Sequence, residues 1–284
     1  MRLLVTGAGG MLGQDVVRAA EAHGDEVIAL ARGDLDVTDE RAVAGAMSDE
    51  QVDAVINCAA WTDVDGAESD PDGADAVNAL GADHVANAAA HVGARLVHVS
   101  TDYVFDGDRS SDEAAYVESD VPGPRSVYGA SKLAGEEAVV AAGGSHAIVR
   151  SSWLFGVGGR NFVATMLELG AERNEVTVVD DQVGCPTATA HLAPALLALA
   201  REEDAQGIFH VAGAGQCTWH DLAVEAFRQA GIACRVLPCA TADMPRPAPR
   251  PAFSALASER DDAPLLPPWQ EGLTTYLAQR GVHA

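Results

Sequence analysis

The chain has 284 residues, a formal net charge of −24 and an apolar content of 48%. This length is sufficient for a full domain with a smaller second lobe, and the apolar content predicts a globular core rather than disorder. A strongly negative field repels nucleic acids and anionic membrane surfaces, so neither is expected as a partner. The longest apolar stretch, around Leu192 to Ala200, is far shorter than the roughly 20 residues that span a bilayer.

Cysteine and histidine usage indicates a reducing compartment and no metal site. The five cysteines are odd in number and contain no C-x-x-C pair, and the nine histidines lack the spacing of metal ligands. The apolar run that opens the chain is also too short for the apolar region of a signal peptide. We therefore expect a cytoplasmic protein without a disulfide framework or a bound metal.

The first half of the chain alternates short apolar runs with alanine-rich stretches of helical length. The strand-like runs cover residues 3–6, 27–31, 54–59, 95–100 and 147–150, and the helical stretches cover residues 12–23, 39–47, 76–91 and 131–142. Two further runs, 176–179 and 208–211, have the composition of strands. This alternation predicts an α/β fold with a doubly wound parallel sheet of the Rossmann type.

The sequence pattern changes after about residue 212. Thr218 and Asp221 have the spacing of a capping box that opens a helix over residues 222–231, a proline-rich segment follows, and a last helix is predicted over 269–279. We expect residues 1–150, with about 176–212, to form the Rossmann domain. Residues 151–175 and 213–284 would form a smaller C-terminal substrate-binding lobe.

A glycine-rich loop follows the first predicted strand and opens the first helix. Its glycines lie at Gly7, Gly10 and Gly13, with Met11 and Leu12 between the last two. Glycines allow a tight turn and close approach of the backbone to a pyrophosphate, and the N–H groups of the helix N-terminus favour the anion. Because the loop stands in this strand–turn–helix context, it predicts dinucleotide binding.

The end of the second strand indicates which dinucleotide is bound. Arg32 stands where an acidic residue would favour the ribose hydroxyls of NAD, so it could meet the 2′-phosphate of NADP. We therefore expect residues 1–150, with about 176–212, to be an NADP(H)-binding Rossmann domain that uses NADPH, with NADH as a weaker substitute. Asp36, which precedes Val37, could contact the adenine or cap the next helix.

A tyrosine and a lysine lie four residues apart at the start of a predicted helix. This spacing places Tyr128 and Lys132 on one face, one turn apart. Carbonyl reduction needs a proton donor, and a neighbouring cation can lower the high pKa of a tyrosine. Lys132 is the only lysine in a chain that otherwise uses arginine. Thr101 ends the fourth strand, where a doubly wound sheet binds its ligand, and could bond to the substrate oxygen.

These segments together resemble the dTDP-4-dehydrorhamnose reductase family within the extended short-chain dehydrogenase/reductase superfamily. The resemblance runs almost from end to end and is carried by the glycine loop and by segments 57–65, 100–105, 128–132, 150–153, 161–166, 180–187 and 250–256. It implies a catalytic set of Thr101, Tyr128 and Lys132.

The resemblance and the residues above also imply two sets of ligand contacts. The cofactor set is Gly7, Gly10, Met11, Leu12, Gly13, Arg32, Asp36, Val37, Ala59, Ala60, Thr62, Ser100, Tyr128 and Lys132. The sugar-nucleotide set is Val64, Thr101, Asp102, Tyr103, Tyr128, Trp153 and Arg250. The implied activity is that of an oxidoreductase: hydride from NADPH reduces the 4-keto group of dTDP-4-dehydro-L-rhamnose to dTDP-L-rhamnose, with Tyr128 as proton donor.

Three other functions are compatible with parts of the pattern. A nucleotide-sugar 4,6-dehydratase would need an Asp-Glu pair after Thr101, but the chain has Asp102-Tyr103 there. A nucleotide-sugar 4-epimerase usually has a longer C-terminal lobe. A non-catalytic, reductase-like regulatory subunit of methionine adenosyltransferase would not need the complete Thr, Tyr and Lys set. Turnover of NADPH with a 4-keto sugar nucleotide separates the reductase from all three.

Some members of this family are dimers joined through magnesium held by glutamates. Asp15 could supply one such carboxylate, but Ala190 and His191 stand where a second acid would be needed. We therefore expect no metal, and a monomer or weak homodimer.

Overall fold

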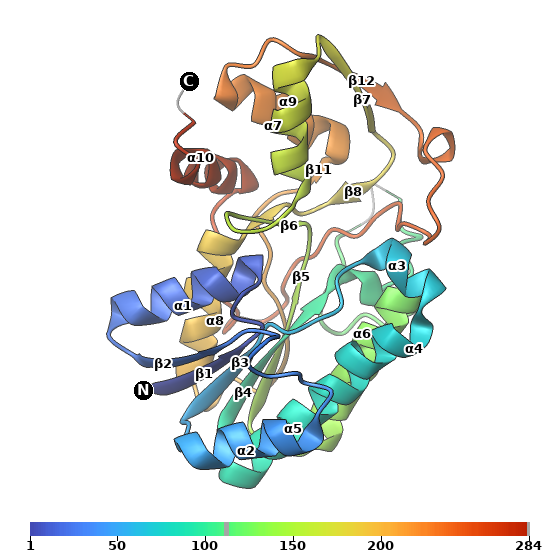
Figure 1. Ribbon diagram of the computed structural model, residues 1–284. Helices are drawn as coiled ribbons and strands as arrows, with labels where there is room; N and C mark the ends of the chain where they lie inside the picture. Colours follow the sequence, from blue (N-terminus) through green and yellow to red (C-terminus); the bar gives the residue numbers. More distant parts are fainter. Residues whose placement is uncertain (111–113, 283–284) are drawn as a thin grey trace.

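A central sheet of six parallel strands organises the molecule (Figure 1). The computed structural model describes residues 1–110 and 114–282. In spatial order the strands are β10 (Gly207–His210), β5 (His146–Ser151), β4 (Arg95–Thr101), β3 (Ala54–Asn57), β1 (Arg2–Thr6) and β2 (Glu26–Leu30). Reversal of the strand order on either side of β1 and β3 makes the sheet doubly wound, so the predicted fold class is confirmed.

Helices cover both faces of this sheet (Figure 1). One face is covered by α1 (Met11–His23) and α8 (Thr189–Arg201), and the other by α2 (Glu40–Glu50), α5 (Gly81–Val92) and α6 (Val127–Ala141). Two apolar clusters fill the space between the sheet and these layers, one on each side. Burial on both faces explains why the inner strands are apolar along their whole length.

Side-chain caps fix where the helices begin. Asp39 accepts hydrogen bonds from two backbone amides at the start of α2, and the Ser126 hydroxyl accepts one from Gly129 at the start of α6. Because Ser126 is the cap, α6 begins four residues before the predicted start at residue 131. Tyr128 therefore lies in the first turn of the helix, next to the edge of the sheet.

Short helical segments connect β3, β4 and their neighbours at the same edge. These are α3 (Val64–Ser69), α4 (Pro71–Asp75), the π-helical turn η1 (Ala76–Leu80) before α5, and the 3₁₀ turn η2 (Asp102–Val104) after β4. Asp63 and Asp70 cap α3 and α4 by accepting bonds from Gly66 and Gly73. Of these segments, η1 lies within the helix predicted over residues 76–91, whereas α3, α4 and η2 were not predicted.

A second lobe lies beyond the carboxyl ends of the strands (Figure 1). It contains α7 (Phe162–Glu172), α9 (Trp219–Ala230), α10 (Trp269–Gln279) and the 3₁₀ turn η3 (Thr241–Asp243). Three two-stranded sheets join it: β12 (Arg235–Cys239) with β7 (Glu175–Val179), β11 (Cys217–Thr218) with β8 (Val183–Gly184), and β6 (Leu154–Phe155) with β9 (Thr187–Ala188). The predicted capping box at Thr218 and Asp221 and the helix over 269–279 are both present.

One predicted strand of the central sheet is placed wrongly. The run 176–179 forms β7, which pairs with β12 in the second lobe, whereas the run near 208–211 forms β10 and extends the central sheet. In β7 buried and exposed residues alternate, because only one face of this strand meets apolar neighbours. A central strand would have been buried on both faces.

Candidate active site

The turn between β1 and α1 brings the backbone close to the next strand. Gly7 has a left-handed φ of +64°, and a Cβ there would lie 2.7 Å from the backbone nitrogen of Ala59. A Cβ on Gly13 would lie 2.3 Å from the carbonyl oxygen of Gly7. Side chains at these two positions would push the loop and helix away from the sheet.

The N-terminus of α1 is open to an anion. Gly10 is the N-cap and offers no side chain to the first amides, and the first turn contains no acidic residue. The N–H groups and the positive end of the helix dipole are thus directed at the loop. Met11 and Gln14 contact a second glycine-rich loop, because Gln14 donates to the Gly158 carbonyl at 3.3 Å and Asn161 lies against the Met11 sulfur.

Residues after β2 line the same edge. Arg32 is exposed and close enough to Asp36 to lower the pKa of that carboxyl, although hydrogen bonds from the Thr38 amide and hydroxyl are the main cause. Asp36 therefore ends in a local turn, and capping of α2 falls to Asp39. Val37 is buried against the start of α5. Capping, one of the two roles left open for Asp36, is thus excluded.

The segment after β3 is fixed by two buried asparagines. Asn57 accepts from the Ala59 amide at 3.2 Å, and Asn78 accepts from the Trp61 amide at 2.8 Å. Ala59 and the following Ala60 are partly buried, whereas Thr62 is exposed. The predicted cofactor residues of this segment therefore lie beside the glycine loop, on a backbone whose position is fixed by these hydrogen bonds.

Thr101 and Tyr128 meet where β4 ends and α6 begins. The Thr101 hydroxyl donates to Asp102 at 3.1 Å and accepts from the Tyr103 amide at 3.2 Å. The rings of Tyr103 and Tyr128 pack edge to face, 5.5 Å between centroids. A Cβ at Gly129 would lie 2.2 Å from the Tyr103 carbonyl oxygen, so glycine allows the helix to approach this turn.

The environment keeps the Tyr128 phenol protonated. Burial raises the pKa of Tyr128 to about 12; a hydrogen bond with Thr101 opposes this shift and the charge of Asp102 adds to it. Lys132, only 2% exposed, donates from Nζ to the Val99 carbonyl at 2.7 Å and lies 3.4 Å from Nε2 of His98. Across residues 1–110 and 114–282, no hydrogen bond joins Lys132 to Tyr128, so the predicted lowering of the tyrosine pKa by the lysine stays a prediction.

A buried ion pair lies one turn further along α6. Glu136 accepts from Nη2 of Arg150 at 2.6 Å and from its Nε at 2.9 Å, and Ser100 donates to the same carboxylate at 2.5 Å. All three residues are at most 5% exposed. The hydroxyl of Ser100, a predicted cofactor residue, is therefore directed into the protein and not toward the open edge.

Asp102 is a buried carboxyl at the candidate substrate side. Burial raises its pKa to about 6, and hydrogen bonds from Ser254 and Thr101 oppose the shift. Its Oδ2 atom is buried without a hydrogen bond at the distances and angles usual for one, within the described residues. A ligand hydroxyl would satisfy this oxygen.

The remaining predicted substrate residues come from three elements. Val64 opens α3, and its neighbour Asp65 holds Arg250 through an ion pair of 3.0 Å. Arg250, Tyr103 and Arg125 line a cavity of about 170 Å³. Trp153 has a φ of +48° and stacks on Trp219 with 3.5 Å between ring centroids. The structure thus brings Tyr103 and Arg250 to one cavity, while Trp153 packs against Trp219 of the second lobe.

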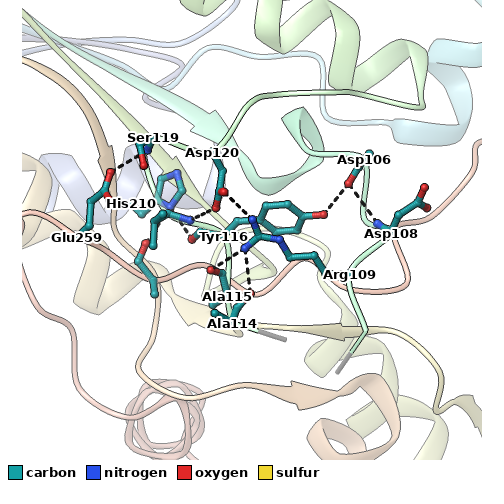
Figure 2. A network of polar contacts seen from close by, with 12 residues as sticks. Asp106, Asp108, Arg109, Ala114, Ala115, Tyr116, Ser119, Asp120, His210 and Glu259 are labelled. Carbon is teal, nitrogen blue, oxygen red and sulfur yellow. Dashed lines mark hydrogen bonds and ion pairs between the residues drawn. The ribbon is translucent and has the colours of Figure 1, made fainter. Parts of the chain in front are cut away.

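A polar network supports the segment after β4 (Figure 2). Tyr116 donates to Asp106 at 2.6 Å, and the Arg109 guanidinium lies 4.1 Å from the Tyr116 ring while it pairs with Asp120. The Tyr116 ring stacks on Phe105, 4.2 Å away. These contacts hold the chain after β4 against β10, because Nδ1 of His210 donates to the Tyr116 carbonyl at 3.0 Å.

Comparison with known proteins decides the family. The model of the family described as RmlD substrate binding domain matches residues 1–281. The chain belongs to this family. It is 46% identical to the dTDP-4-dehydrorhamnose reductase of Mycobacterium tuberculosis strain H37Rv, over 98% of this chain and 92% of the relative.

Two solved structures support the assignment to the RmlD substrate binding domain family. A dTDP-4-dehydrorhamnose reductase of Clostridium acetobutylicum has a TM-score of 0.94 at 42% identity, covering 99% of this chain and 100% of that one. One from Bacillus anthracis, in complex with NADP, has a TM-score of 0.94 at 38% identity, covering 98% and 99%. The predicted family resemblance is confirmed.

Several buried polar residues of the candidate site were not predicted from the sequence. His98, Asn57 and Glu136 are buried beside Lys132 or its neighbours. The available signal was a polar side chain in an otherwise apolar strand, as at His98. Asp180, His220 and Asp221 also come together on the surface with atoms that could hold a metal ion. Asp221 already caps α9 and Asp180 accepts from Thr218, and we assign no ion there.

Asp102 gives a prediction for stability. Its pKa is raised, so the neutral form stabilises the fold below about pH 4, and this contribution is lost as the pH rises through about 6. Asp102→Asn should therefore raise the free energy of unfolding at about pH 8 by on the order of 1–3 kcal/mol, and by about half as much at about pH 5. Denaturant unfolding at both pH values measures this. A larger gain at the lower pH would contradict it.

Asp15 gives a second prediction, on chelators. Its carboxylate is 4% exposed and is bonded by Arg18 and by the Thr189 hydroxyl, so it is directed inward and not toward another subunit. We expect the elution volume in size-exclusion chromatography to be the same with and without EDTA. Loss of a dimer peak on chelation would show that a metal bridge exists.

Proposed function

We propose that the chain reduces the 4-keto group of dTDP-4-dehydro-L-rhamnose to dTDP-L-rhamnose, with NADPH as the hydride donor. The observation that carries the proposal is the pairing of Thr101 with Tyr128 at the carboxyl edge of the sheet, beside an open glycine loop. Family membership and the names of relatives at up to 46% identity agree with it. Bound NADPH supplies the hydride that reaches the keto carbon.

The catalytic residues act on the substrate oxygen. Thr101 and Tyr128 hold this oxygen by hydrogen bonds, and Tyr128 transfers its phenolic proton to it as the carbonyl becomes an alcohol. A raised pKa keeps that proton on Tyr128 at neutral pH until the alkoxide, a much stronger base, develops. Lys132 holds ribose hydroxyls of the cofactor and stabilises the phenolate that remains.

The cofactor residues fit a bound dinucleotide in this structure. The uncapped start of α1 takes the pyrophosphate on Gly10, Met11 and Leu12, and Gly7 and Gly13 keep this approach open. The predicted contacts of Arg32 with the 2′-phosphate, of Asp36 and Val37 with the adenine, and of Ala59, Ala60, Thr62 and Ser100 with the rest of the cofactor stay proposals. Among them Ser100 fits least, because its hydroxyl is bonded to Glu136.

The sugar nucleotide lies between the sheet edge and the second lobe. Asp102 accepts a hydrogen bond from a sugar hydroxyl through Oδ2, and Tyr103 and Val64 contact the sugar. Arg250 offers positive charge for the diphosphate in a chain whose net charge is −24. Trp153 contributes a flat apolar surface from the opposite side. Residues 1–150 with about 189–212 serve the cofactor, and 151–188 with 213–284 serve the substrate, since β7, β8 and β9 of the predicted 176–212 segment join the second lobe.

The alternatives lack support at the site. A dehydratase would need an acid–base pair after Thr101, and Asp102 is followed by Tyr103. A regulatory subunit would have no use for Tyr128 and Lys132 together. The decisive assay follows oxidation of NADPH with dTDP-4-dehydro-L-rhamnose and identifies the product sugar. Release of a 4,6-dehydrated or epimerised product without net NADPH consumption would overturn the proposal.

Cofactor preference tests the role of Arg32. We expect a higher kcat/KM with NADPH than with NADH, because an exposed guanidinium follows β2 where an acid would repel the 2′-phosphate. Arg32→Ser should reduce this preference without changing kcat with NADH. Comparison of both cofactors on both proteins gives the answer, and a strong NADH preference of the unmodified chain would contradict the argument.

Two further observations concern the location of the protein. Among the described residues, no helix has the length and apolar character to cross a membrane. Cys58, Cys185, Cys217, Cys234 and Cys239 are all free thiols. We propose a cytoplasmic enzyme that acts on a small-molecule nucleotide sugar as a monomer or weak homodimer.

A further inference from the structure

A chain of buried polar groups runs under the site from β1 to α6. The Thr6 hydroxyl donates to Oδ1 of Asn57 at 2.6 Å, and Nδ2 of Asn57 lies 3.1 Å from Nδ1 of His98. Nε2 of His98 lies 3.4 Å from Nζ of Lys132. Each of these four residues is at most 2% exposed. With water excluded, each hydrogen must be directed at an acceptor, so the positions of the hydrogens can be deduced.

The orientation of the Asn57 amide can be deduced first, from the groups around its oxygen. The Ala59 backbone N–H can only donate, and it is directed at Oδ1 of Asn57 at 3.2 Å. The contact of 2.6 Å with Thr6 is typical of an O–H···O bond and short for an N–H···O bond. Both contacts place the amide oxygen on this side. The amide NH₂ group therefore faces His98 and donates to it.

This donor decides the tautomer of His98. Because Nδ1 accepts from Asn57, the single hydrogen of the neutral ring is on Nε2, which faces Lys132. A protonated lysine has only donors, so two donors would face each other across this contact. An unprotonated amine has a lone pair that can accept from Nε2–H, while its own N–H still donates to the Val99 carbonyl at 2.7 Å.

We propose that Asn57 holds His98 as its Nε2–H tautomer, and that this N–H stabilises the unprotonated amine of Lys132. His98 is thus a positioning residue that sets the protonation of the lysine. Its consequence for catalysis rests on the proposed function, in which Tyr128 gives up its proton and Lys132 stabilises the phenolate that remains. Transfer of a proton from the Lys132 ammonium to this phenolate would restore the phenol and leave the neutral amine. The lysine amine that has given up its proton would be held ready by His98 until solvent returns one.

The other groups around Lys132 act in known directions. Burial lowers the pKa of Lys132 to about 8, and the charge of Glu136 opposes this shift. Glu136 is itself neutralised by Arg150. Cys58 stays an uncharged thiol, because burial raises its pKa to about 12. Burial and the lysine charge hold the pKa of His98 well below its usual range, so the ring remains neutral, as the tautomer argument requires.

The single lysine of the chain allows a direct test. Protein labelled with ¹³Cε-lysine gives one signal, that of Lys132, and its shift against pH reports protonation without substrate or turnover. His98→Gln can turn its amide to offer an oxygen to the ammonium group. We expect the titration midpoint to rise by about one pH unit or more in this variant. The control His191→Gln, on α8 and bonded to Thr275, should leave the midpoint unchanged.

The unmodified protein gives an independent measurement. The ¹⁵N shifts of the His98 ring, assigned by the loss of its signals in His98→Gln, distinguish the two neutral tautomers. We expect Nε2–H at all pH values from about 6 to 9, and an Nδ1–H ring or a charged ring would overturn the proposal. An unchanged lysine midpoint in a folded His98→Gln protein would overturn it too. Neither readout depends on reductase activity, so failure of the proposed function would be recognised separately.

Discussion

Tyr128→Phe is expected to lower kcat by roughly 10²–10⁴-fold, the usual contribution of a general acid. The variant loses only the hydroxyl that lies with Thr101 at the end of β4. Its ring keeps the edge-to-face contact with Tyr103, so the first turn of α6 should not move. The dissociation constant of NADPH should therefore change little. Stopped-flow or steady-state turnover, together with a fluorescence titration of NADPH, measures both quantities.

Tyr276→Phe is the matched control for this experiment. Tyr276 is buried in α10 and accepts from Arg280 at 2.9 Å, so its variant also loses one phenolic hydroxyl, but in the second lobe. We expect its kcat to stay within about twofold of the unmodified protein. If Tyr128→Phe turned over as fast as this control, proton donation by Tyr128 would have to be abandoned.

Lys132→Arg should be nearly as damaging, although it keeps the charge. The lysine is 2% exposed, and its Nζ lies between the Val99 carbonyl and His98. A planar guanidinium is larger, carries five donors and cannot give up its proton at working pH. It would be displaced by about 1 Å or more, which can cost on the order of 10²-fold in kcat. Unlike Tyr128→Phe, this variant should also bind NADPH more weakly.

Lys132→Met separates loss of function from loss of fold. Methionine has a similar length and brings no charge into a site where the buried ammonium is costly. We expect this variant to be as inactive as Lys132→Arg and at least as stable as the unmodified chain at neutral pH. Turnover, NADPH affinity and the thermal midpoint of all three proteins decide the matter. Wild-type kcat in the arginine variant would show that the lysine is not needed at this position.

The sequence was most informative where a single local signal determines an element. The inner strands of the central sheet were predicted because burial on both faces leaves long apolar runs, as in Leu3 to Thr6. The strand β7 was assigned to the wrong sheet because a run of valines shows β structure but not its partner. Its exposed Glu175 and Thr177 alternate with buried valines, which indicates a one-sided strand. Whether β7 pairs with β12 in the second lobe or with a strand of the central sheet, such as β5, depends on tertiary packing.

The motif residues of the candidate site could be predicted from the sequence, but the buried residues that contact them could not. Thr101, Tyr128 and the glycine loop each stand at a strand end or helix start, so their position follows from the fold class. Asn57 and His98 lie in different strands, and their contact depends on the register between β3 and β4. Likewise nothing local links Asp65 to Arg250, which is 185 residues away in sequence yet 3.0 Å in space.

Segments of the two lobes alternate along the chain, and this affects how the protein responds to truncation and proteolysis. The edge strand β10 and the covering helix α8 come after the first segments of the second lobe, and α8 packs on α1 with Leu192 and Leu196 fully buried. A fragment of residues 1–150 would therefore lack one edge of its sheet and expose an apolar face. The two lobes should melt in one cooperative transition, and limited proteolysis should release no stable cofactor-binding piece.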